Sequence, residues 1–243
     1  MNHLITLRYD GTAYHGWQRQ ENAVTVQQRV EEAIAKLFGE EVTASGCSRT
    51  DTGVHANCFK CNFRTEKVIP DANIISGLNF FLPDDIAVYD SHTVADDFNA
   101  RFNCVSKEYI YKIYNGKYPD PFFNHRAMHY KYPLDEKMLD AEAKSYIGKH
   151  DFIAFRASGA TVKTTERTVL HAGVEREGDV VVFRVEADGF LYNMVRIMVG
   201  TLIYISEGKI PQGAIPEIIA SGNRLKAGKT AEACGLYLNK VNY

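Results

Sequence analysis

One carboxylate stands in a polar stretch from Cys47 to Ala56, between two predicted strands. Gly53 permits the tight backbone turn that such a short connection needs. Asp51 can therefore be held at the tip of a loop, where an ionised carboxylate can act as a nucleophile or take up a proton. The alternative is local, since Asp is also frequent in turns because its side chain hydrogen-bonds the nearby backbone. The local sequence leaves both interpretations open.

An isolated charge marks the second candidate, because Arg196 is the only charged residue between Asp188 and Glu207. The stretch from Phe190 to Ile205 is apolar at nearly every position, which is typical of a buried helix. A buried guanidinium without a partner is costly, so Arg196 is expected to pair with a carboxylate from elsewhere in the chain. The alternative is that its stem follows apolar surface while its guanidinium reaches solvent. A membrane span is disfavoured, because a central Arg penalises insertion.

A third candidate is the alternating strand from Lys107 to Tyr114, in which Tyr109, Tyr111 and Ile113 share one face. Half-buried tyrosines are usually core residues. A Tyr ring exposed on a sheet could instead stack on an unpaired base. The spacing does not separate these two interpretations.

The cysteines are odd in number and lack the spacing of a disulfide framework, which indicates free thiols in a reducing compartment. They are Cys47, Cys58, Cys61, Cys104 and Cys234. A zinc site built from Cys47, His55, Cys58 and Cys61 is the alternative, but positions 58 and 61 of a strand point to opposite faces. We expect neither a disulfide nor a metal. The deaminase pattern HxE followed by PCxxC is absent.

Two similar series of elements must position these residues. In the first half we predict the order βαββαβ, with strands at 4–9, 42–47, 59–63 and 86–92. The first helix is capped by Thr25 and Gln28 and closed by Gly39, and the second helix begins near Pro70. In the second half we predict strands at 107–114, 167–175, 180–187 and 235–238, with helices at 135–147, 190–206 and 215–220. Two split βαβ units predict an α+β fold, with joined, mainly antiparallel sheets, a cleft between the halves, and domains at 1–105 and 106–243.

Composition and charge are those of a globular protein, with 243 residues of which 45% are hydrophobic and 24% charged. The N-terminus lacks a basic region followed by an apolar run, so we expect a cytoplasmic protein. The net charge of −2 does not favour a nucleic-acid partner. Residues 1–105 carry 9 Lys and Arg against 14 Asp and Glu, whereas residues 106–243 carry 19 against 16. Any cationic surface must therefore be local and weighted toward the second half.

Several motifs, in the same order along the whole chain, resemble those of the TruA-type pseudouridine synthases. The stretch from Tyr9 to Gln20 resembles their N-terminal signature, and the stretch from Arg49 to Ala56 resembles their catalytic loop. Further matches lie at Asp97–Phe102, His150–Phe152 with Phe155-Arg156, Phe190–Arg196 and Thr230–Leu236.

The resemblance implies the pseudouridine synthase fold with two ferredoxin-like halves, and an enzyme that isomerises uridine in the anticodon stem-loop of tRNA. It implies that Asp51 is the nucleophile, that Tyr109 packs against the uracil, and that Arg196 pairs with Asp51. It further implies RNA contacts by Arg49, Tyr109 and Leu236. It also implies a homodimer without cofactor or metal.

Four positions depart from the family pattern, namely Ser48, Asn99, Cys58 and Phe59. They leave the catalytic residues intact but lie near the expected RNA path, so they bear on which uridines are modified. A catalytically silent RNA-binding module is the remaining alternative, and the presence of both Asp51 and Arg196 argues against it.

Overall fold

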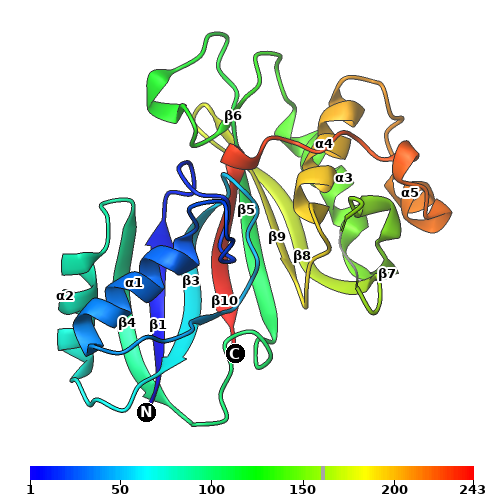
Figure 1. Ribbon diagram of the computed structural model, residues 1–243. Helices are drawn as coiled ribbons and strands as arrows, with labels where there is room; N and C mark the ends of the chain where they lie inside the picture. The colour runs from blue at the N-terminus through cyan, green and yellow to red at the C-terminus, as the bar shows by residue number, and fades with distance from the viewer. Residues whose placement is uncertain (160–161) are drawn as a thin grey trace. The chain divides into compact units, whose positions relative to one another are not determined.

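The computed structural model describes residues 1–159 and 162–243 and divides them into two compact units (Figure 1). The first unit comprises Met1–Val105 together with Tyr237–Tyr243, and the second comprises Ser106–Leu236. Residues Tyr237–Tyr243 thus belong with the first unit, whereas the predicted second domain at 106–243 includes them.

The first unit contains a sheet in the order β4-β1-β3-β10, and β2 pairs with β3. Strand β1 is antiparallel to β3 and β4, while β10 runs parallel to β3. The elements are β1 (Asn2–Tyr9), α1 (Val26–Phe38), β2 (Ser45–Gly46), β3 (His55–Arg64), α2 (Asp71–Phe81), β4 (Ile86–Val94) and the C-terminal β10 (Leu236–Asn242). The predicted order βαββαβ is confirmed for the first half.

Helix α1 begins and ends at its predicted signals. The Thr25 side chain accepts a hydrogen bond from the Gln28 backbone N–H at 3.3 Å, and Gly39 ends the helix in the left-handed conformation at φ 78°. The side chain of Gln28 donates to Glu32 instead of reaching back to residue 25, so only half of the predicted capping box forms. The apolar face of α1 is buried and α1 packs closely on α2, because a Cβ at Gly77 would lie 2.6 Å from Leu37.

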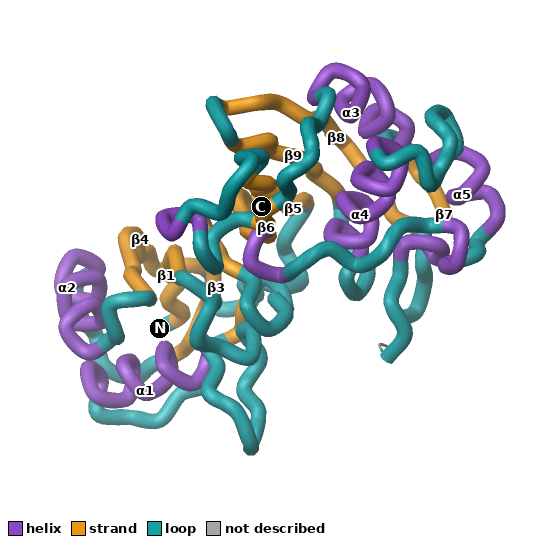
Figure 2. Tube along the Cα trace, turned by 90° about the horizontal axis from the view of Figure 1, so that it is seen from above, coloured by secondary structure: helices purple, strands orange, loops and turns teal. Residues whose placement is uncertain are grey.

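The second unit contains a sheet in the order β5-β9-β8-β7, with neighbouring strands antiparallel, and a short β6 lies parallel to β5. Figure 2 shows its helices beside β7, β8 and β9. The elements are β5 (Ser106–Tyr114), β6 (Met128–His129), α3 (Glu136–Ala143), β7 (Gly148–Asp151), β8 (Glu166–Glu177), β9 (Val180–Ala187), α4 (Met194–Ser206) and α5 (Ile215–Ser221). Single 3₁₀ turns lie at Pro121–Phe123, Lys144–Tyr146, Ile153–Phe155, Arg224–Lys226 and Ala233–Gly235. The predicted α+β class and mainly antiparallel pairing are confirmed.

Five predicted boundaries differ from the structure by more than two residues. Strand β3 begins at His55 instead of Phe59, and β10 ends at Asn242 instead of Leu238. The helix expected from Phe190 begins at Met194, because Asn193 has φ 60° and a left-handed residue cannot continue a right-handed helix. The helix expected to reach Ile147 ends at Ala143 and continues as a 3₁₀ turn. The strand expected at 42–47 is reduced to β2, because the Ala44 N–H donates to the Glu31 side chain at 3.0 Å.

Helix α4 is buried at every position except the partly exposed Arg196, Tyr204 and Ser206. The prediction of a buried apolar helix with one charge is therefore confirmed. No helix within 1–159 and 162–243 has the length and hydrophobicity that crossing a membrane requires.

Candidate active site

The loop that carries Asp51 connects β2 to β3 and closes as a turn. The Val54 N–H donates to the Asp51 carbonyl at 3.1 Å, and Gly53 takes the positive φ of 75° that the turn requires. Asp51 is partly buried and Arg49, two residues earlier, is exposed. The carboxylate therefore sits on a short, hydrogen-bonded turn, as the sequence predicted.

The segment from Asp10 to Trp17 holds this loop through its backbone. The Trp17 N–H donates to the Thr50 carbonyl and the Gly53 N–H donates to the Tyr14 carbonyl, both at 3.2 Å. The two hydroxyl groups of Tyr9 and Thr50 share a buried hydrogen bond of 2.8 Å. Two motifs that are far apart in the sequence thus form one structure on both sides of Asp51.

Glycines allow the close approach between these two segments. At Gly16, which has φ 82°, a Cβ would lie 2.2 Å from the Thr50 carbonyl oxygen and 3.1 Å from the Asp51 carbonyl carbon. At Gly11 a Cβ would lie 2.0 Å from the Val54 carbonyl oxygen. Both distances are below any real van der Waals contact, so only glycine fits at these positions.

The strand that follows the loop is anchored by a buried histidine. His55 Nδ1 accepts a hydrogen bond from the Gly11 N–H at 3.0 Å and lies 3.2 Å from Asp10 Oδ1. Its ring stacks on Tyr237, with ring centroids 4.6 Å apart. Both ends of the loop are therefore fixed to the same segment of the first unit.

In the second unit, Tyr109 lies on β5 opposite Val185 of β9 and is 6% exposed. Its ring meets that of Phe190 edge to face, with centroids 5.0 Å apart. Tyr111, two residues along the same face, is fully buried and donates its hydroxyl to the Glu232 carbonyl at 2.7 Å. Both rings are buried in the structure, and the contact of Tyr109 with a base stays a prediction.

Arg196 lies on α4, where its guanidinium contacts two oxygens of its own unit. Its Nε donates to the Ala231 carbonyl at 2.7 Å, and one terminal nitrogen donates to Asn193 Oδ1 at 2.8 Å. The Ala231 N–H in turn donates to the Arg196 carbonyl at 3.1 Å. These contacts fix the direction of the side chain, and the pairing of Arg196 with Asp51 stays a prediction.

The remaining predicted site residue, Leu236, is the first residue of β10 and is buried. Just before it, a Cβ at Gly235 would lie 2.6 Å from the Tyr111 ring. The stretch that carries Ala231 and Leu236 therefore packs against both Arg196 and the tyrosine-bearing strand of the second unit.

Sequence reasoning missed the residues that support the candidate groups. Tyr9 and Thr50, whose hydroxyl groups share a hydrogen bond, stand out in the sequence only as parts of the two motifs. Asn193, which accepts a hydrogen bond from Arg196, lies inside the predicted helix. An Asn directly before the helix was the available signal for Asn193, since Asn tolerates the left-handed conformation. No sequence signal pairs Tyr9 with Thr50, because that contact depends on how β1 lies beside the loop.

Two of the residues that depart from the family pattern, Asn99 and Phe59, have local structural roles. The Asn99 side chain donates to Ser45 Oγ at 3.2 Å and accepts from the Arg101 N–H at 2.9 Å. Phe59 is buried and stacks on Trp17, with ring centroids 4.1 Å apart.

The cysteines proposed for a zinc site lie on or beside β3. Burial raises the pKa of the Cys61 thiol well above its usual range, which opposes the thiolate that a metal would need. Among the residues that the structure describes, no group of three or more His, Cys, Asp or Glu side chains is arranged to hold a metal ion.

Comparison with known proteins identifies relatives over the whole chain. A family model described as tRNA pseudouridine synthase matches residues 5–103 and 143–243. The tRNA pseudouridine synthase A of Acetivibrio thermocellus is 48% identical, and the alignment covers 100% of this chain and 99% of the relative. The protein of the same name from a Thermoanaerobacter species is 47% identical, and the alignment again covers 100% of this chain and 99% of the relative. A chain in the solved crystal structure of a Cbf5-Nop10-Gar1 complex aligns with 98% of this chain. The alignment covers 48% of the solved chain, with 13% identity and a low TM-score of 0.38.

Proposed function

The chain belongs to the tRNA pseudouridine synthase family, and we propose that it isomerises uridine to pseudouridine in tRNA with Asp51 as the catalytic carboxylate. The observation that carries the proposal is the loop itself. Asp51 is the only acid between Cys47 and Ala56, and the loop is held on both sides by the segment from Asp10 to Trp17. Such fixed geometry is what a positioned catalytic group requires.

The reaction needs one ionised oxygen near the ribose. The bond from C1′ to N1 breaks, the uracil turns, and C1′ joins C5. The hydrogen at C5 leaves as a proton, and N1 takes up a proton. Atoms and electrons balance without an oxidant or reductant. The carboxylate promotes this either by adding to the sugar or by removing a ribose proton to give a glycal. Both routes begin from ionised Asp51.

Arg196 is the group we assign to keep that carboxylate ionised, because a nearby cation favours the charged form. Its contacts with Ala231 and Asn193 support this role, since they hold the guanidinium in one direction.

Tyr109 is assigned to the uracil, as a packing surface and as the base that takes the C5 proton. Its ring is held by Phe190, which supports a fixed position. Arg49 is assigned to the RNA, because it is exposed two residues before Asp51 and can enter the space left by an unstacked base. Leu236 is assigned to the apolar wall of the site that receives the uracil.

We assign the anticodon stem-loop as the modified region, a homodimer as the active form, and the cytoplasm as its location. These assignments rest on resemblance to the family. A stable, fully active monomer in sedimentation at assay concentration would contradict the dimer.

The test of the proposed function is to map pseudouridine in tRNA and rRNA from cells with and without this protein. We expect the loss of defined pseudouridines from the anticodon stem-loops of several tRNAs, and their return when the gene is restored. An unchanged tRNA map, or loss confined to rRNA, would contradict the proposal.

A further inference from the structure

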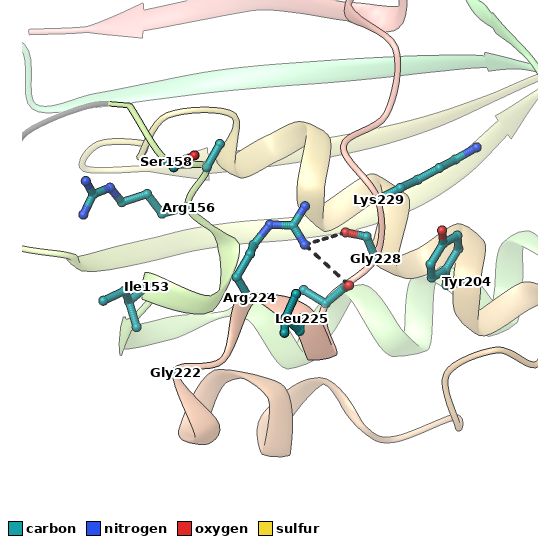
Figure 3. A pocket seen from close by; sticks show the side chains of 11 residues that line it. Ile153, Arg156, Ser158, Tyr204, Gly222, Arg224, Leu225, Gly228 and Lys229 are labelled. Atoms are coloured by element: carbon teal, nitrogen blue, oxygen red, sulfur yellow. Dashed lines mark hydrogen bonds between the residues drawn. The ribbon is translucent and has the colours of Figure 1, made fainter.

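A pocket of about 840 Å³ opens in the second unit, and none of the residues assigned to catalysis lines it. It lies where the turn at Ile153–Phe155, the end of α5 at Gly222 and the segment from Arg224 to Lys229 meet Tyr204 of α4 (Figure 3). Tyr204 follows Arg196 by eight residues on α4, which is about 12 Å along a helix that rises 1.5 Å per residue.

The residues lining this pocket include three cations and no acid. The cations are Arg156, Arg224 and Lys229, and Figure 3 shows Arg224 between the other two. Between Glu217 and Glu232 the only charged residues are Arg224, Lys226 and Lys229. In a chain with a net charge of −2, this is a local concentration of positive charge.

Arg224 is held in place by the segment that follows it. Its guanidinium donates to the Gly228 carbonyl at 2.8 Å and lies 3.4 Å from Thr230 Oγ1. Gly228 is itself fixed, because its N–H donates to Thr201 Oγ1 at 2.8 Å and a Cβ there would lie 2.2 Å from the Gly200 carbonyl oxygen. Burial lowers the pKa of Arg224 from its ordinary value, and the side chain remains a cation.

The rim of the pocket also presents apolar surface. Leu225 is 91% exposed and Ile153 is 40% exposed, while Tyr204 forms part of the wall. The carboxylate of Glu207 interacts electrostatically with Lys229 and forms an ion pair with Lys209 at 2.7 Å. The pocket therefore combines a fixed guanidinium, further cations and apolar edges.

We infer that this pocket binds the phosphate backbone of the tRNA substrate, as an anchoring site separate from the catalytic residues. This inference rests on the proposed function, which supplies the RNA. Guanidinium and ammonium groups neutralise phosphates and release counterions, and the apolar rim contacts the sugar or a base. Anchoring of this kind fixes the position of the RNA and carries no sequence information.

Lys229 is the residue for the test, because its side chain is exposed. Replacing Arg224 would also loosen the segment from Ala227 to Thr230, which its guanidinium contacts. The matched control is Lys137→Ala, since Lys137 is exposed on α3 of the same unit and its loss changes the net charge equally. The probe is an unmodified tRNA transcript, whose dissociation constant is measured across a series of salt concentrations.

We expect Lys229→Ala to weaken tRNA binding roughly five-fold near 0.1 M salt and to reduce the slope of log K against log salt by about 0.7 to 0.9, the share of one phosphate contact. Lys137→Ala should change neither value. Equal effects of the two variants, or an unchanged slope for Lys229→Ala, would overturn the inference. Protection of the wild-type fold by inorganic phosphate, with tRNA binding unaffected by Lys229→Ala, would also overturn it and assign the pocket to a small anion.

Pseudouridine formation by the wild-type protein is measured in parallel. Tight, salt-dependent tRNA binding without turnover would contradict the proposed function and leave the anchoring site standing. Turnover by the wild-type protein, together with an unchanged salt slope for Lys229→Ala, would support the proposed function and contradict the anchoring site.

Discussion

Tyr109 allows packing and proton transfer to be tested separately at the scale of one residue. Tyr109→Phe keeps the ring that meets Phe190 edge to face and removes only the hydroxyl. We expect an unchanged unfolding midpoint and a fall in pseudouridine formation of about 100-fold or more, the lower end of what a general acid or base contributes.

The control is Tyr111→Phe, on the same face of β5. It removes a hydroxyl that donates to the Glu232 carbonyl, so it should lower the free energy of unfolding by about 1 kcal/mol without a comparable loss of turnover. Wild-type rates for Tyr109→Phe would remove the hydroxyl from the mechanism and leave Tyr109 a packing residue.

At the scale of the element, the Asp51 loop depends on how closely the Asp10–Trp17 segment approaches it. Gly16 and Gly39 share a left-handed backbone, with φ 82° and 78°, but only Gly16 meets another backbone within 4 Å. Gly39→Ala should therefore cost about 1 kcal/mol of stability from the conformation alone and keep its activity.

Gly16→Ala adds a collision with Thr50 and Asp51 to the same conformational cost. We expect it to reduce turnover at least 10-fold beyond any loss for Gly39→Ala, because displacement of a catalytic group by 1 Å can cost about 100-fold. Equal turnover of the two variants, measured at a temperature where both are folded, would show that the segment does not position Asp51.

Elements with strong local signals were predictable from the sequence, whereas contacts between distant segments were not. Thr25, Gly39 and the apolar spacing of α1 are local signals, and the helix begins and ends where they indicate. The start of α4 was misplaced, because the apolar run continues through Phe190 while the left-handed Asn193 breaks the helix.

The same limit applies to the candidate site. The loop that carries Asp51 and the isolation of Arg196 could both be read from the chain. The hydrogen bond between Tyr9 and Thr50 and the contact of Arg196 with Ala231 could not, because each joins segments that are 35 or more residues apart. Such contacts depend on strand register and loop packing, which no local pattern specifies.

In the whole molecule, Arg196 and Asp51 must act together in the proposed mechanism, although they belong to different units. A nearby cation lowers the pKa of a carboxyl group, so the ionised form needed for catalysis persists to lower pH. Arg196→Met should therefore lower turnover and move the acidic limb of the pH–rate profile to higher pH. Arg176→Met serves as the control, because Arg176 belongs to the same unit and pairs with Glu136 at 2.9 Å. An acidic limb that stays in place for Arg196→Met would contradict the pairing of Arg196 with Asp51.

The proposed mechanism requires the carboxylate of Asp51 to perform the chemistry. Joining C1′ to C5 displaces the hydrogen at C5, so turnover is measured directly as tritium released from tRNA transcripts labelled at C5 of uridine. Asp51→Asn is nearly isosteric but offers neither a useful nucleophile nor a useful base. It should release no tritium above background while binding tRNA within about three-fold of wild type, since phosphate contacts and stacking supply most affinity. Substantial tritium release by Asp51→Asn, with contaminating host enzyme excluded, would contradict the account.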